Sequence, residues 1–163
     1  MKKKANKKDL NDIMEVFKIH KDTLPPVRSD KIERMIKEGK VIWEDEVVIT
    51  YNHYKRSQRI GTYYRSARKG DCILHQIAAK NQGDGSAKKV FLRFLDFNKG
   101  KDVWLSVRAD NKRAIAFYEK QDFAEVGDIE WGKENQIKGK VFLFDTVPFH
   151  VTRDTDFNEL ASN

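Results

Sequence analysis

Apolar positions near the start of the chain recur at helical spacing. Those of a first predicted helix are Leu10, Ile13, Met14 and Phe17. Asp9 stands where it can cap this helix. Those of a second, shorter helix are Ile32, Met35 and Ile36. Asp30 and Glu33 have capping-box spacing at its start, and Gly39 is expected to end it in the left-handed conformation. The Pro25-Pro26 pair between the two helices predicts an extended connection.

From residue 40 the pattern changes to β-branched and aromatic runs, which are typical of strands. Strands are predicted over residues 41–43, 47–51, 60–64, 72–78, 103–107, 123–126 and 140–144. Helical stripes follow over residues 87–95 and 112–120. This order predicts a mixed α/β domain with one parallel crossover in the middle and helices flanking the sheet.

Length and composition favour a single soluble domain. The chain has 163 residues, of which 39% are hydrophobic and 35% are charged. No apolar run approaches the roughly 18 to 20 residues of a membrane span. In the absence of repeats or linkers, we assign one domain to residues 1–146 and a C-terminal extension, loop or short helix, to residues 147–163.

The net charge of +7 favours an anionic partner without saying which one. Cys72 is the single cysteine, so no internal disulfide can form, and a reducing cytoplasm is the natural setting. Its place in an apolar strand predicts a buried core thiol. No spacing of histidine and cysteine resembles a zinc site.

The segment Asn81-Gln82-Gly83-Asp84-Gly85-Ser86-Ala87 follows an apolar strand and opens a predicted helix. Such a junction gathers unpaired backbone N–H groups at one point and makes an anion site, usually for phosphate. The spacing fits neither the dinucleotide fingerprint nor the P-loop. From this segment alone, a plain strand-to-helix turn and a phosphate-binding loop both stay open.

A second motif extends from Val107 to Phe123. Its residues Asn111, Ala114, Phe117, Tyr118, Glu119, Lys120 and Phe123 resemble the corresponding motif of the GNAT acyltransferases (GCN-five-related N-acetyltransferases). The segment 82–87 is similar to the pyrophosphate loop of that family, Gln/Arg-x-x-Gly-x-Gly/Ala. The resemblance covers most of residues 1 to 145. Two departures stand out: Asp122 replaces a usual glycine, and the connection from Ala79 to Gln82 is shorter than usual and lacks the common proline.

The resemblance implies a mixed, mostly antiparallel sheet in which strands 72–79 and 103–107 are parallel and splay apart around acyl-CoA, most simply acetyl-CoA. The residues implied to bind this cosubstrate are Ile77, Ala78, Ala79, Gln82, Gly83, Asp84, Gly85, Ser86, Ala87, Asn111 and Tyr118. Backbone N–H groups of residues 83–87 would hold the pyrophosphate, and an N–H near residues 77–79 would stabilise the oxyanion. Asn111 would contact the pantetheine arm or cap its helix.

Direct attack of an amine on the thioester is the implied reaction, with Tyr118 as general acid. Its reference pKa of about 10 exceeds the thiol value of about 8.5, so the phenol is protonated at neutral pH. The base is less clearly marked. His75 has a suitable reference pKa of about 6.5 but could equally be a packed side chain, and Glu44 or Glu46 could act through water.

The acceptor carries no motif. A small-molecule or protein amine is the first expectation, a nucleobase as in Mom-like DNA modification is the second, and a catalytically silent binding module is the third. Segments 51–59 and 63–69 interleave aromatic and basic residues, which suits nucleic acid or a solvated hairpin. Lysines 2–4, 7 and 8 suit a basic arm or a protected edge strand. A homodimer is left open.

Overall fold

The computed structural model describes residues 3–24 and 26–145. Its elements are η1 (Lys7–Asp9), α1 (Leu10–Ile19), α2 (Ser29–Lys37), β1 (Val41–Glu44), β2 (Val47–His53), β3 (Cys72–Ala79), α3 (Ser86–Phe97), β4 (Val103–Arg108), α4 (Lys112–Lys120), β5 (Ala124–Trp131), η2 (Lys133–Asn135) and β6 (Ile137–Phe144). They fall into two compact units. The first contains the described residues up to His53 together with Ile73–Phe97, and the second contains Tyr54–Cys72 and the described residues from Asn98 onwards. The predicted mixed α/β class is confirmed.

In the first unit, β1 and β2 form an antiparallel hairpin. Asp45 and Glu46 make its turn with φ values of 50° and 58°, the conformation that matches the twist of the two strands. The Lys80 N–H donates to the Glu46 carbonyl at 3.0 Å, and the Thr50 hydroxyl donates to the Gln76 side chain at 3.0 Å. These contacts advance along β2 while they recede along β3, so the two strands are antiparallel.

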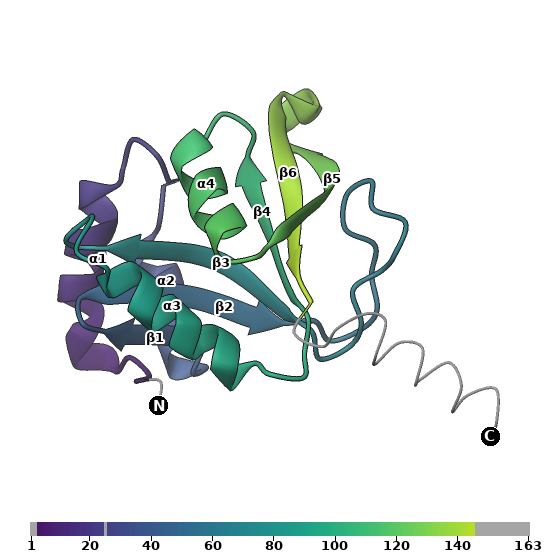
Figure 1. Ribbon diagram of the computed structural model, residues 1–163. Coiled ribbons are helices and arrows are strands. Elements are labelled where there is room, and N and C mark those ends of the chain that lie inside the picture. Colours follow the sequence, from purple (N-terminus) through teal and green to yellow (C-terminus); the bar gives the residue numbers. More distant parts are fainter. Residues whose placement is uncertain (1–2, 25, 146–163) are drawn as a thin grey trace, which may run out of the picture. The chain divides into compact units, whose positions relative to one another are not determined.

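Helices cover both faces of these strands (Figure 1). The core on one face is formed by Ala5, Ile13, Val16, Phe17, Ile32, Met35, Ile36, Val41, Val48 and Ala78. It joins α1 and α2 to the strands. On the other face, the ring of Tyr51 meets that of Phe94 from α3 at 5.4 Å. Side chains alternate along a strand, so Val48 and Tyr51 of β2 point to opposite faces. The predicted apolar stripes of all three helices are confirmed.

Both predicted caps of the first two helices are wrong. The Asp9 carboxylate accepts from the Asn6 N–H at 2.9 Å, so it closes a 3-10 turn before α1. Asp30 lies inside the first turn of α2, where it pairs with Arg28 at 3.0 Å. Gly39 has a φ of 71°, which confirms the left-handed end of α2. Pro25, part of the predicted extended connection, lies outside the described residues, as do residues 147–163.

In the second unit, β6 pairs antiparallel with β4 on one side and with β5 on the other. Strands β5 and β6 are longer than predicted. Lysines of β6 form ion pairs with acidic residues of β5 across the two strands: Lys138 with Glu130, and Lys140 with Asp128 and Glu125. Asp128 and Glu130 alternate with Ile129 and Trp131, an alternation that the sequence analysis did not use.

The predicted strand over residues 60–64 is wrong, because residues 54–71 form a loop apart from one isolated bridge between Gln58 and Ala67. Gly61 takes a φ of 55°, and a Cβ there would lie 2.2 Å from the Asp128 carbonyl. Thr62 donates its N–H to that carbonyl at 2.9 Å and accepts from the Asp128 N–H with its hydroxyl. Cys72 is buried, as predicted. None of the described helices is long and apolar enough to cross a membrane.

Candidate active site

The segment between β3 and α3 turns through two left-handed glycines. Gly83 and Gly85 both have a φ of 83°. A Cβ built at either position would meet no atom within 4 Å. Glycine is therefore favoured here by the left-handed backbone conformation. A methyl side chain would not clash with other described residues. The space around these two Cβ positions is open in the described part of the protein.

Asp84 already places a negative charge at the start of α3. Its carboxylate accepts from the Ser86 N–H at 2.9 Å and from the Ser86 hydroxyl at 2.6 Å. These bonds lower the pKa of Asp84 below its usual value. One of the N–H groups predicted to hold pyrophosphate is thus bonded within the loop. The first-turn N–H groups of α3 that follow have no carbonyl one turn back within the helix.

The acidic turn, defined as Glu44, Asp45 and Glu46 between β1 and β2, holds cations that flank this loop. Asp45 binds Lys89 of α3 at 2.8 Å, and this bond lowers the pKa of Asp45. Glu46 binds Lys80, the first residue after β3, at 3.0 Å. Glu44 is bonded to an arginine of α3, Arg93. Glu44 and Glu46, considered above as bases acting through water, are therefore both engaged in ion pairs.

His20, at the C-terminal end of α1, belongs to this site and was not identified from the sequence. Its Nε2 lies 2.8 Å from the Ala79 carbonyl, and its Nδ1 lies 3.2 Å from Nε2 of Gln82. A carbonyl oxygen only accepts, so Nε2 carries the proton and Nδ1 accepts from the Gln82 amide. His20 thus ties the end of β3 and the first residue of the loop to α1. No local motif marks it, because its partners are 59 and 62 residues away.

The remaining predicted residues of the first unit lie on β3. Ala78 and Ala79 are buried, Ile77 is half-buried, and His75 is exposed. Crowding by protein atoms, together with the positive charge of Lys31, lowers the pKa of His75 below 6.5. A lowered pKa keeps the imidazole neutral at pH 7, the form that a base requires.

Asn111 and Tyr118 belong to the second unit, at the start and near the end of α4. The Asn111 side chain accepts from the Ala114 N–H at 3.2 Å, so its predicted role as helix cap is confirmed. Tyr118 is 7% exposed and packs against the rings of Phe123 and Phe142. Burial raises the pKa of Tyr118, so the phenol holds its proton.

The end of α4 adopts a Schellman motif in spite of the departure at Asp122. Asp122 has a φ of 67°, the conformation for which the family uses glycine. The Phe123 N–H donates to the Tyr118 carbonyl at 3.1 Å, and the Asp122 N–H donates to the Glu119 carbonyl at 3.1 Å. The two rings that flank the cap, Tyr118 and Phe123, are 5.8 Å apart. The motif therefore fixes the backbone of the residue predicted to be the general acid.

Comparison with known proteins agrees with this architecture. No protein-family model matches the sequence. The chain is 33% identical over 92 residues to N-alpha-acetyltransferase RimI of Mycobacterium tuberculosis, a match that takes in 50% of this chain and 58% of that protein.

Solved structures give a broader match. A GNAT family acetyltransferase from Bacillus cereus has a TM-score of 0.64 at 16% identity, covering 89% of this chain and 96% of that one. Arabidopsis thaliana NAA60, solved in complex with acetyl-CoA, has a TM-score of 0.60 at 19% identity, covering 85% and 94%. The chain therefore has the fold of the GNAT acetyltransferases, and the resemblance seen in its sequence is confirmed at that level.

Proposed function

We propose that this protein is an acyl-CoA-dependent N-acyltransferase that moves an acetyl group from acetyl-CoA to an amine. The observation that carries the proposal is the loop from Gln82 to Ala87. Two left-handed glycines without side chains stand there, with open space at both Cβ positions, at the strand-to-helix junction of a GNAT fold. The similarity to RimI, named as an N-alpha-acetyltransferase, and to NAA60, solved with acetyl-CoA, supports the choice of cosubstrate and of an amine acceptor.

Backbone groups would bind the cosubstrate, which supplies an acyl group activated as a thioester. N–H groups of residues 83–87 would donate to the pyrophosphate, and one N–H of residues 77–79 would donate to the carbonyl oxygen as it gains negative charge. Asp84 would have to turn away from Ser86 or tolerate a second anion nearby. This local conflict makes the loop of this chain a weaker anion site than glycine and backbone alone would make.

The proposed reaction forms a bond between the amine nitrogen and the acyl carbon while the carbon–sulfur bond breaks. His75, neutral at pH 7, would accept the amine proton. Tyr118 would donate its proton to the departing sulfur and regain one from solvent. The raised pKa of Tyr118 keeps the phenol protonated at neutral pH, which this role requires. It also makes the phenol a weaker acid, so hydrogen-bond donation to the sulfur is expected to be its main contribution. That Tyr118 and β3 meet at one cleft stays a prediction.

A thermal-shift and thiol-release experiment tests the proposal. Acetyl-CoA should raise the melting temperature, and an amine or peptide acceptor should release free CoA thiol. Tyr118→Phe should keep the thermal shift and lose most of the thiol release. Stabilisation without release by any amine, peptide or nucleic acid would point to the binding-module alternative. No stabilisation by acetyl-CoA or by other acyl-CoAs would refute the enzyme proposal as a whole.

A nucleobase acceptor remains the second candidate. Burial of Tyr51 and Tyr54 removes two of the aromatics on which that interpretation of residues 51–69 rested. The exposed face of the loop that follows β2 supports it more specifically, as argued next. A cytoplasmic location and a homodimer remain proposals drawn from the sequence.

A further inference from the structure

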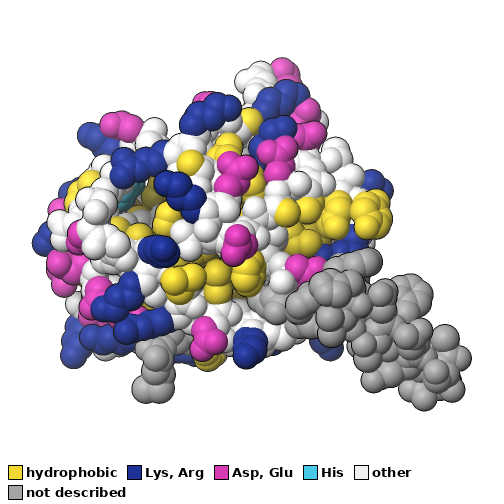
Figure 2. Space-filling view, in the orientation of Figure 1, with side chains coloured by type: hydrophobic (Ala, Val, Ile, Leu, Met, Phe, Trp, Pro, Cys, Tyr) yellow, Lys and Arg dark blue, Asp and Glu magenta, His cyan; other side chains and the backbone are white. Residues whose placement is uncertain are grey.

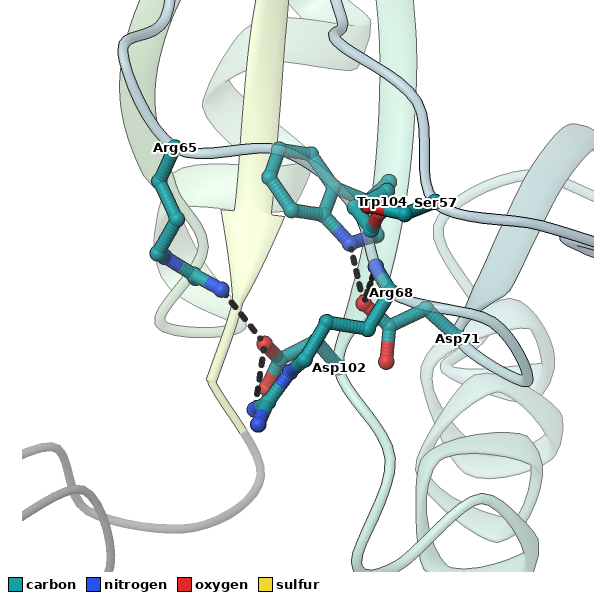
Figure 3. Close-up of polar contacts among 7 residues, drawn as sticks. Ser57, Arg65, Arg68, Asp71, Asp102 and Trp104 are labelled. Atoms are coloured by element: carbon teal, nitrogen blue, oxygen red, sulfur yellow. Dashed lines mark hydrogen bonds and ion pairs between the residues drawn. The ribbon is translucent and has the colours of Figure 1, made fainter. Parts of the chain in front are cut away.

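The loop between β2 and β3 is held from inside the second unit. Asp71 accepts from the Trp104 indole N–H at 3.1 Å and from the Arg68 N–H at 2.8 Å (Figure 3). Arg65 binds the carboxylate of Asp102 at 3.1 Å, and that aspartate side chain is 3% exposed. A loop of this length without regular structure is uncommon in a compact domain and usually has a function.

Aromatic rings complete the anchoring. The Arg65 guanidinium lies 5.3 Å from the centre of the Trp104 ring and 5.7 Å from that of Tyr63. Gln58 and Ala67 exchange two backbone hydrogen bonds across the loop, and the Ser57 hydroxyl donates to the Ala67 carbonyl. These contacts fix the backbone of the loop. Tyr54 and Ile60 are buried, while its lysines and most of its arginines are exposed.

The charged side chains of residues 54–70 are all basic. The exposed cations are Lys55, Arg56, Arg59 and Lys69, together with Arg68, which also pairs with Asp102 at 3.8 Å. Tyr64, in the same loop, is 80% exposed. The neighbouring acidic side chains of β5 are already paired with Lys138 and Lys140. Figure 2 shows basic and acidic side chains interspersed on the face of the molecule that it draws.

We propose that the exposed face of loop 54–70 binds single-stranded nucleic acid. Its cations would neutralise successive phosphates, and Tyr64 would stack on a base. An acidic protein would use the same cations but would gain less from an exposed tyrosine ring, since stacking on bases favours flat aromatic surfaces. The internal anchoring holds this surface in place before binding, so little ordering would be needed on association. The inference does not depend on the acyl-transfer proposal.

Binding of a fluorescent 20-nucleotide oligo-dT, followed by anisotropy from 50 to 300 mM salt, tests this inference. Affinity should fall steeply with salt. Removing three cations of the loop (Lys55→Gln, Arg56→Gln and Arg59→Gln together) should reduce the slope of log K against log salt by roughly 2, at about 0.7 per phosphate contact. Tyr64→Ala should weaken binding by about 5-fold to 100-fold.

A matched control removes the same amount of positive charge from another part of the chain. Lys8, Lys21 and Lys37 are exposed cations of the first unit, and changing all three to glutamine lowers the net charge by the same amount. The inference requires this control to retain the slope of the unmodified protein. Equal loss of slope in both triple variants would show that net charge, not the loop, drives binding, and would overturn it.

Three further outcomes would also overturn it: no binding of oligo-dT at micromolar protein and 50 mM salt, equal competition by polyglutamate, or tighter binding of duplex DNA with no effect of Tyr64→Ala. Unchanged melting temperatures would show that the variants are folded. Stabilisation by acetyl-CoA is measured on the same samples. Failure of nucleic-acid binding with that stabilisation intact would therefore count against the loop alone.

Discussion

Replacing Gly85 by alanine separates the two interpretations of the loop between β3 and α3. The substitution places an L-residue at a φ of 83°, where the left-handed conformation costs about 1–2 kcal/mol. The added methyl group meets no protein atom within 4 Å, so no clash adds to this cost. For a chain of 163 residues, we expect the melting temperature to fall by roughly 2–8 °C.

The effect on acetyl-CoA should be larger than the effect on folding. The methyl group would project into the open space in front of the loop, where phosphate oxygens are proposed to meet backbone N–H groups. Losing one hydrogen bond to a charged oxygen costs about 1.5–3 kcal/mol, which is roughly a 10-fold to 100-fold loss of affinity. Isothermal titration calorimetry with acetyl-CoA at a temperature well below the transition measures it directly.

Gly100 supplies the matched control. It has a φ of 90° and, like Gly85, no atom within 4 Å of a Cβ. It lies beyond the far end of α3, a helix of 12 residues and so about 18 Å long. Gly100→Ala should lose similar stability and bind acetyl-CoA as the unmodified protein does. If Gly85→Ala also binds normally, the glycines serve only the turn and the reasoning is refuted.

Four more substitutions test other parts of the site. Asp84→Asn removes a like charge from the proposed pyrophosphate site and should tighten acetyl-CoA binding roughly fivefold, about 1 kcal/mol at 4 Å in water; unchanged affinity by calorimetry would contradict this. His20→Phe keeps a ring but loses both hydrogen bonds, so the affinity for acetyl-CoA should fall roughly fivefold. Adding Gln82→Leu to this variant should cause no further loss of affinity. Additive losses would disprove that His20 and Gln82 act through their hydrogen bond. Asp122→Gly should relieve left-handed strain and raise the free energy of unfolding by about 0.5–1 kcal/mol in urea titrations, while Asp122→Ala should lower it. With its pKa below 6.5, His75 stays neutral as the pH falls through 6.5. The acid limb of kcat/KM should therefore lie below pH 6.5 and disappear in His75→Gln. The contribution of His75 to the free energy of unfolding, present above pH 6.5, should be lost as the pH falls through the lowered pKa.

The helices that the sequence predicts best are those with local signals. For α4, the cap at Asn111 and the apolar stripe give both ends of Lys112–Lys120 correctly, because the signals lie within one turn of the boundary. Residues 60–64 have the composition of a strand, but Ile60 is buried by packing and Thr62 bonds to Asp128 across the unit. Composition alone cannot distinguish burial in a loop from pairing in a sheet.

The candidate active site also contains features that local sequence predicts and features that depend on packing. Glycine conformations and the Asn111 cap follow from local sequence and are confirmed. The bond from Asp84 to Ser86 is also local, and an Asp two residues before a helical Ser is a known turn signal that the sequence analysis did not use. His20 is different. Its contacts with Ala79 and Gln82 depend on how α1 packs on the strands, which one sequence does not specify.

The acidic turn has a consequence for selectivity. It engages Lys80, Lys89 and Arg93, so part of the positive charge that flanks the proposed cofactor loop is already paired, while the backbone of the loop offers directional N–H donors. Inorganic phosphate, nucleotides and other cellular polyanions are drawn chiefly by charge and should compete poorly there. The exposed cations of loop 54–70 have no such acidic partners within their own segment. A strongly basic protein can thus keep its most phosphate-specific site from being saturated by the anions that its surface attracts.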